Sequence, residues 1–210
     1  MKERILAAAC ELFAERGVDA VALDAIAKRA RLSIEQVRRQ FGGKRPLYEA
    51  CLQASLEEMR AFIPAIEQQL ATSHLPLPLA IAEGVHTGVR FVREHRIAVR
   101  LLQRSLLEDR EEDARFHREA YAIADELARI CAGVVGKPRA AYVLPLRSIV
   151  VLVVRYALGT ERDGEKPVAG DDANAPPRTD PKSGFDEYLT SAVAGLLGIS
   201  SGARRRPTTD

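Results

Sequence analysis

The chain has 210 residues, of which 47% are hydrophobic and 29% charged, and its formal net charge at pH 7 is +2. This length allows one large domain or two small ones with a substantial core, and the composition is ordinary for a soluble globular protein. The most apolar run, Ser148 to Leu158, is too short to span a bilayer and contains Arg155, so we expect a buried helix there and no membrane partner.

Three short amphipathic helices are predicted in the first fifty residues. Their ranges are 3–16, 23–30 and 33–41. Ser33 and Gln36 have the spacing of a capping box, which predicts the start of the third helix. Val37 and Phe41 lie one turn apart and should face inward, and the two glycines at 42–43 should end this helix.

Longer helices are predicted in the remainder, where no alternation typical of strands is found. Their ranges are 46–70, 79–94, 95–108, 109–135, 139–159 and 185–197. Residues 160–184 are rich in Pro, Gly and Asp and are predicted to form a mobile loop, and residues 199–210 a disordered tail. The predicted fold is therefore all-α with about nine helices, divided into a small domain over 1–48 and a larger one over 49–198.

The three cysteines lie in helical, apolar patterns far apart in the sequence, at Cys10, Cys51 and Cys131. The odd number, together with an amphipathic and acidic amino terminus unlike a signal peptide, indicates reduced, packed thiols in the cytoplasm. A redox role is the alternative interpretation.

Charge is unevenly distributed along the chain. Residues 1–48 contain ten Lys or Arg and six Asp or Glu, a net charge of +4, and the remainder carries −2. A basic module joined to a slightly acidic one indicates a polyanionic partner for the first module.

The helices at 23–30 and 33–41 are separated by a tight turn behind a supporting first helix, which is a helix-turn-helix arrangement. The second of the two normally lies in the major groove of double-stranded DNA, where Arg can contact guanine, Gln adenine and Glu cytosine. The predicted DNA-binding residues are Ser33, Ile34, Glu35, Gln36, Arg38, Arg39, Gln40 and Lys44. Lys44 and Arg45 also stand beside a helix amino terminus, which favours a phosphate. A solvated face is the alternative for Arg38 and Arg39.

Four elements between Arg4 and Leu52 carry a family resemblance: "RILAAACELFAERG", "IAKRA", the capped third helix and "FGGKRPLY". Together they resemble the amino-terminal domain of the TetR family of bacterial transcriptional regulators. The resemblance implies a DNA-binding domain over 1–48 and a ligand-binding and dimerisation domain over 49–198. It also implies a homodimeric repressor that binds a palindromic operator and is released by a small-molecule effector.

The sequence departs from the family pattern at several positions. Val21 and Ala22 replace the usual Thr or Ser before the second helix, and Arg31 replaces a small turn residue. Arg38 stands where an aromatic residue usually touches the DNA backbone. We expect these changes to alter which operator is read while leaving the fold intact.

By the resemblance, the middle helices enclose a ligand and the last two helices form the dimer interface. The candidate ligand-lining residues, for which simple core packing is the alternative, are Met59, Phe62, Phe91, Phe116 and Tyr121. The candidate interface residues are Leu146, Val150, Val154, Tyr188, Ala192 and Leu196. Arginines recur every three or four residues between Arg90 and Arg104, which is typical of a solvated face or, alternatively, of an anionic ligand site.

No catalytic constellation, phosphate-binding glycine loop or cofactor motif is found, and the four histidines lack metal-ligand spacing. We therefore expect no enzyme activity, no metal and no cofactor. A helical adaptor that binds an acidic protein through the basic module is the alternative function, and a small-molecule enzyme is less favoured.

Overall fold

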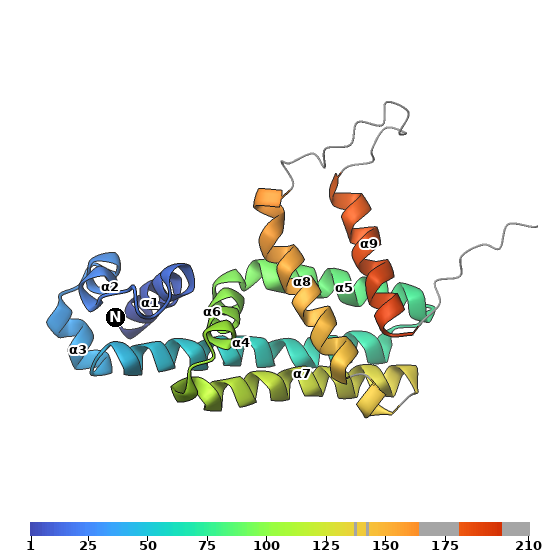
Figure 1. Ribbon diagram of the computed structural model, residues 1–210, viewed down its shortest axis with the longest axis horizontal. Coiled ribbons are helices and arrows are strands. Elements are labelled where there is room, and N and C mark those ends of the chain that lie inside the picture. The colour runs from blue at the N-terminus through green and yellow to red at the C-terminus, as the bar shows by residue number, and fades with distance from the viewer. Residues whose placement is uncertain (137, 142, 164–180, 199–210) are drawn as a thin grey trace, which may run out of the picture. The chain divides into compact units, whose positions relative to one another are not determined.

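The computed structural model describes residues 1–136, 138–141, 143–163 and 181–198. All regular elements within these residues are helical, which confirms the all-α prediction (Figure 1). The α-helices are α1 (Lys2–Arg16), α2 (Leu23–Ala30), α3 (Ile34–Phe41), α4 (Lys44–Thr72), α5 (Leu77–Glu94), α6 (Arg96–Glu108), α7 (Ala114–Val135), α8 (Val143–Asp163) and α9 (Pro181–Leu196). Two 3-10 turns are η1 (Glu111–Asp113) and η2 (Arg139–Ala141). The predicted tail at 199–210 lies outside the described residues.

The segment predicted as a mobile loop, 160–184, is helical at both ends. α8 continues to Asp163 and α9 begins at Pro181, while residues 164–180 lie outside the described part of the chain. Pro181 suits the first position of a helix because its missing N–H would have no partner there. Composition alone predicted a loop that is four residues too long at each end, so the predicted α8 ended and the predicted α9 began four residues short of the observed helices.

The prediction of one continuous helix over 109–135 is also corrected. Asp109 adopts a left-handed conformation, with φ 43° and ψ 47°, and its N–H donates to the carbonyl oxygen of Ser105 at 3.1 Å, which ends α6. η1 then leads into α7. Aspartate enters this conformation more readily than most residues because its short side chain can bond locally.

The chain forms two compact units. The first contains Met1–Pro64 and Glu94–Asp125, and the second contains Ala65–Arg93 and Glu126–Asp210. The predicted boundary after residue 48 does not coincide with this division, because α1 packs against α6 as well as against α2 within the first unit.

The core of the first unit is built from the inward faces of α1, α2, α3 and α4. Phe13, Ile26, Val37 and Leu47 have no exposed surface. The Phe13 ring meets the Tyr48 ring edge-on, with centroids 5.3 Å apart and planes at 86°. Complete burial of such side chains stabilises the fold by about 1.5–3 kcal/mol each, so α3 is firmly fixed through Val37.

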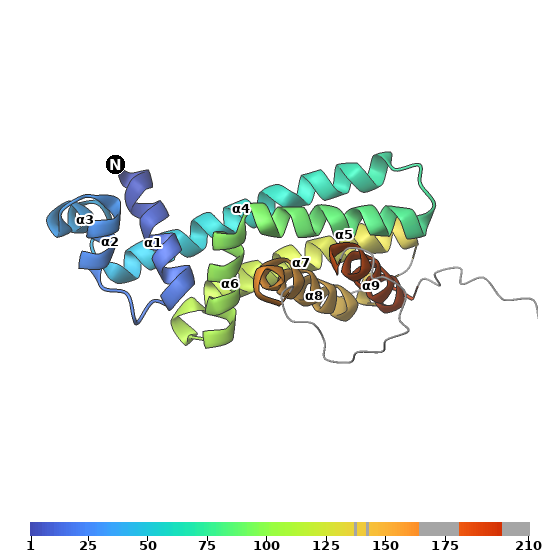
Figure 2. The ribbon, with the colours of Figure 1, turned by 90° about the horizontal axis from the view of Figure 1, so that it is seen from above.

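In the second unit, α8 and α9 pack side by side (Figure 2). Val153 and Tyr156 of α8 and Leu189 and Val193 of α9 are buried. The guanidinium of Arg93 lies over the Tyr156 ring, 5.7 Å from its centroid. Across the described residues, we find no helix with the length and apolar character that a membrane span needs.

Candidate DNA-binding surface

The turn between α2 and α3 is set by an arginine in an unusual backbone conformation. Arg31 has φ 54° and ψ 50°, the left-handed region that a side chain normally disfavours. Its N–H donates to the Lys28 carbonyl oxygen at 3.1 Å, and the next N–H, of Leu32, donates to Ala27 at 2.9 Å. These bonds satisfy the last carbonyl groups of α2 and reverse the chain toward α3.

The predicted capping box at the start of α3 is formed. The Gln36 amide N–H donates to Ser33 Oγ at 3.2 Å, and the Ser33 N–H donates to Gln36 Oε1 at 2.8 Å. The Gln36 side chain is therefore engaged in a hydrogen bond within the protein, and this bond competes with its predicted role in reading adenine.

The predicted DNA-binding residues divide by exposure. Ser33, Glu35, Arg38 and Arg39 are exposed, whereas the others are partly buried. The partly buried ones are Ile34, Gln36, Gln40 and Lys44. Ile34 packs against the core of the first unit, so its side chain contributes to packing as well as to the surface.

The two adjacent arginines of α3 are exposed basic groups. Within the part of the chain that the structure describes, neither Arg38 nor Arg39 forms an ion pair. Glu35, near the start of the same helix, has a lowered carboxyl pKa because its own backbone N–H and the Ser33 hydroxyl bond to it, with Arg38 adding attraction. A charged carboxylate at this helix end is an acceptor for a base amino group.

Lys44 and Arg45, predicted together as phosphate contacts, point to different partners. Lys44 Nζ donates to the Asp19 carbonyl oxygen at 3.4 Å, a long contact that leaves its other protons available. Arg45 is turned into the protein: its Nη2 is 2.6 Å from Asp113 Oδ1, and its Nε donates to Glu49 at 2.9 Å. The prediction of a phosphate contact for Arg45 does not fit this geometry.

Asp113 is the centre of a buried polar cluster that sequence reasoning missed. Its side chain has no exposed surface, and it accepts from Arg45, from the Tyr48 hydroxyl at 3.4 Å and from Ser105 Oγ at 3.3 Å. Ser105 Oγ also lies 3.1 Å from His117 Nε2. These residues come from α4, α6, η1 and α7, and no local pattern in the sequence links elements so far apart.

The Tyr48 hydroxyl is protonated up to a higher pH than an exposed tyrosine because of its burial. Burial raises the pKa of its hydroxyl to about 12, because the charged phenolate would be poorly solvated there. Tyr48 therefore remains a proton donor to Asp113 at neutral pH.

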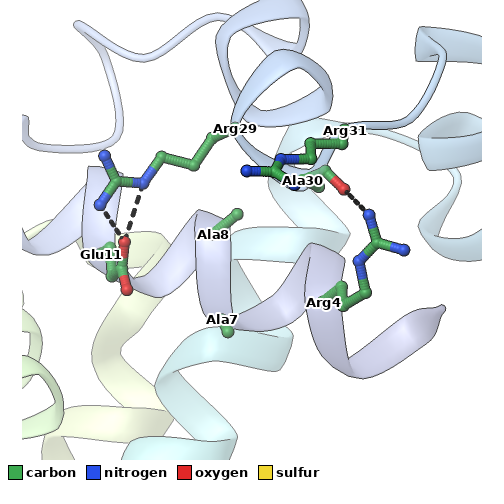
Figure 3. A pocket seen from close by; sticks show the side chains of 7 residues that line it. All are labelled: Arg4, Ala7, Ala8, Glu11, Arg29, Ala30 and Arg31. Carbon is green, nitrogen blue, oxygen red and sulfur yellow. Dashed lines mark hydrogen bonds and ion pairs between the residues drawn. The ribbon is translucent and has the colours of Figure 1, made fainter.

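A cleft of about 540 Å³ lies between α1 and α2 (Figure 3). Its lining residues are Arg4, Ala7, Ala8, Glu11, Arg29, Ala30 and Arg31. Arg29 Nε donates to Glu11 at 2.8 Å, and Arg4 Nη2 donates to the Ala30 carbonyl oxygen at 2.6 Å. These arginines hold α1 to α2, and no predicted ligand-lining residue borders the cleft.

The five predicted ligand-lining residues are distributed over both compact units. Phe91 belongs to the second unit and the other four to the first. Phe116 is a core residue with 2% exposure, whereas Tyr121 is 47% exposed. The Arg115 guanidinium lies over the Phe116 ring, 4.4 Å from its centroid. Met59 and Phe62 are partly buried.

The apolar side chains exposed on α8 differ from those predicted for the dimer interface. Leu146 is buried and Val150 and Val154 are half-buried. The exposed apolar residues are Leu144, Val151 and Leu152 on α8, with Leu196 on α9. Of the remaining predictions, Ala192 is half-buried, and the side chain of Tyr188 lies outside the described residues.

Comparison with known proteins agrees with this geometry. Residues 5–51 match the family model described as bacterial regulatory proteins, tetR family. The α2–α3 arrangement and this match define a helix-turn-helix DNA-binding protein. The predicted resemblance of the amino-terminal domain to the TetR family of bacterial transcriptional regulators is therefore confirmed. No curated protein matches the sequence.

Solved structures share the fold over nearly the whole chain. A TetR-like transcriptional regulator from Rhodococcus sp. RHA1 is 20% identical, with 93% of this chain and 95% of that chain covered and a TM-score of 0.60. The fatty acid degradation regulator FadR from Bacillus halodurans is 13% identical, with 95% and 100% covered and a TM-score of 0.58. The multidrug binding protein EbrR, complexed with imidazole, is 16% identical, with 98% of each chain covered and a TM-score of 0.55.

Proposed function

We propose that this protein is a homodimeric repressor that binds a palindromic operator through α3 and is released by a small-molecule effector. The observation that carries the proposal is the exposed pair Arg38 and Arg39 on a capped helix, inside a helix-turn-helix that matches the family. Arg38 and Arg39 contact guanine edges or the adjoining phosphates, and Lys44 contacts a phosphate.

The buried cluster around Asp113 supports a coupling route to the DNA-binding helices. Arg45 is next to Lys44 and bonds to Asp113 and to the Glu112 carbonyl oxygen, at 2.6 and 3.1 Å. The start of α4 is therefore tied to the turn between α6 and α7. An effector that binds one arrangement of these helices more tightly shifts the population toward it, by no more than its difference in affinity.

The proposal of an effector is supported by a protein with a similar fold. EbrR, which shares the fold, is described as a multidrug binding protein. We extend small-molecule binding to this chain without assigning the compound, and we propose no enzymatic step.

The proposed dimer uses the exposed apolar face of α8 and α9. Leu144, Val151 and Leu152 are 72%, 63% and 40% exposed, and Leu196 is 40% exposed. Residues 144, 151 and 152 share one face of α8 because they are spaced by seven and eight positions. Two copies joined symmetrically would present two reading helices to half-sites about one DNA turn apart.

DNA binding is tested by fluorescence anisotropy with the duplex immediately upstream of the gene and with a scrambled duplex, each at two salt concentrations. We expect a preference for the upstream duplex that persists at the higher salt concentration. Arg38→Ala should reduce this preference, whereas Arg100→Ala, which removes an exposed arginine from α6, should leave it unchanged.

Equal binding to both duplexes that disappears at higher salt would contradict sequence reading at this site. It would favour the adaptor alternative, in which the basic module meets an acidic protein.

Dimerisation is tested by analytical ultracentrifugation of Val151→Asp. We expect this substitution to produce monomers, because it places a charge in the proposed apolar interface. Leu107→Asp is the matched control, since Leu107 is 79% exposed on α6. If Val151→Asp remains dimeric while its helical content is intact, the α8 face is not the interface.

A further inference from the structure

Two cysteines that lie far apart in the sequence meet in the first compact unit. Cys10 is partly buried on α1, and Cys51 is fully buried on α4. Cys51 Sγ lies 3.8 Å from the carbonyl oxygen of Leu6. Leu6 is one helical turn before Cys10, so the two positions share a face of α1. The Cys10 thiol is near enough to Cys51 to raise the pKa of the Cys51 thiol.

The surroundings of the pair are apolar. Cys51 belongs to the core cluster of this unit, and Cys10 packs against that cluster. Among the described residues, no group of three His, Cys, Asp or Glu side chains is arranged to hold a metal ion. Two adjacent thiols without further ligands are suited to forming a bond with each other.

We propose that Cys10 and Cys51 are a redox modification site, which hydrogen peroxide converts reversibly into a disulfide between α1 and α4. The Cys10 thiolate attacks one peroxide oxygen, the O–O bond breaks, and the departing hydroxide takes up a proton to become water. Cys10 is then a sulfenic acid. Cys51 loses its proton and attacks the Cys10 sulfur, and the S–O bond breaks with release of a second water. The two thiols lose two electrons, which reduce the peroxide.

The order of the two steps follows from exposure. Cys10 has exposed surface through which peroxide can reach it, whereas Cys51 has none. The contact with Cys10 and burial both raise the pKa of the Cys51 thiol, so Cys51 is the less reactive partner toward peroxide in solvent. Cys51 reacts only with the sulfenic acid at Cys10, because the proximity of the two side chains gives each a high effective concentration at the other.

The bond would enclose α2 and α3 within a covalent loop running from residue 10 to residue 51. A disulfide that closes a loop of this length restricts the unfolded chain substantially. We expect oxidation to raise the Tm of the protein by roughly 5–10 °C, and reduction to reverse the rise. This expectation concerns the first unit alone and does not depend on the proposed DNA-binding function.

The test treats the full-length protein with a small excess of hydrogen peroxide. Intact mass should fall by two hydrogens, one of the three thiols should remain titratable, and peptide mapping should link Cys10 to Cys51. Dithiothreitol should restore the original mass and Tm. Three free thiols after treatment, a link to Cys131, or over-oxidation of Cys10 without a disulfide would each overturn the proposal.

Single substitutions identify the two roles. Cys51→Ala should accumulate a sulfenic acid at Cys10 that dimedone traps, whereas Cys10→Ser should show no dimedone adduct at Cys51. Cys131→Ser is the control and should still form the disulfide, because Cys131 lies in the second unit, where burial raises its thiol pKa to about 11. Cys10→Ser keeps the test valid if the core substitution at Cys51 prevents folding, since Cys10 is only partly buried.

Discussion

Arginines within eight positions of one another serve different purposes in the α3 surface and in the buried cluster at the start of α4. Arg38 and Arg39 project from α3 without an ion pair in the described part of the chain. Arg45 is one-third exposed and bonds to Glu49, Glu112 and Asp113. A basic residue near α3 is therefore a candidate for DNA contact only when it does not already form an ion pair with an acidic side chain of the protein.

The two regions also differ in how a substitution should act. A solvated arginine costs little to remove from the folded protein, because exposed charges contribute little to stability. Removing one partner from a buried polar cluster leaves the others without compensation, which is strongly destabilising. Stability and DNA affinity should therefore respond to different substitutions.

The largest effect is expected for Asp113→Ala. It would leave Arg45, Tyr48 and Ser105 without their shared acceptor, and we expect a loss of about 2–4 kcal/mol in the free energy of unfolding, measured by urea denaturation. Glu112→Gln is the matched control, because Glu112 is 71% exposed while pairing with the same arginine. Its cost should stay below about 1 kcal/mol. Equal costs for the two variants would show that Asp113 does not organise the cluster.

The second effect is a loss of stability at high pH. The Tyr48 hydroxyl has a pKa of about 12 in the folded protein, against an ordinary value of 10.0. Between these values the unfolded chain has released the proton and the folded protein still holds it, so stability present below about pH 10 is lost as the pH rises toward 12. The loss should be about 2–3 kcal/mol.

Urea denaturation at several pH values up to 12 measures this change, and Tyr48→Phe provides the comparison. The phenylalanine variant should lose less stability over the same pH interval, because it has no hydroxyl to titrate. Parallel curves for the two proteins would assign the alkaline instability to other groups.

The third effect belongs to the DNA-binding surface. Lys44→Ala removes a predicted phosphate contact, and we expect about 1 kcal/mol weaker binding to every duplex, with the slope of log K against log salt reduced by about one. Anisotropy titrations at several salt concentrations measure both quantities. A loss confined to one sequence, with an unchanged slope, would mean that Lys44 reads a base instead. The free energy of unfolding should change little, which distinguishes Lys44 from Asp113.

The sequence was sufficient for the all-helical fold and for the cap of α3, because both depend on neighbours within a few positions, but it missed the break at Asp109 and the ends of α8 and α9. Ser33 and Gln36 are three residues apart, and their reciprocal bonds were predicted. The cluster at Asp113 could not be predicted, because its donors come from positions 8 to 68 residues away. The proximity of Cys10 to Cys51 was missed for the same reason. Only the packing of α1 on α4 brings these thiols together.

The smallest effect is expected for Ser33→Ala, which removes the acceptor for the Gln36 N–H at the start of α3. Loss of a helix cap of this kind costs about 1 kcal/mol, so urea denaturation should show a modest decrease in the free energy of unfolding. The bond from the Ser33 backbone N–H to Gln36 Oε1 is kept in this variant, because it does not involve the Ser33 hydroxyl. If Gln36 reads adenine, Gln36→Ala should relax specificity at one base pair while phosphate binding persists. Unchanged base preference, measured by anisotropy with singly substituted duplexes, would confine Gln36 to its structural role and leave Arg38 and Arg39 as the principal reading residues.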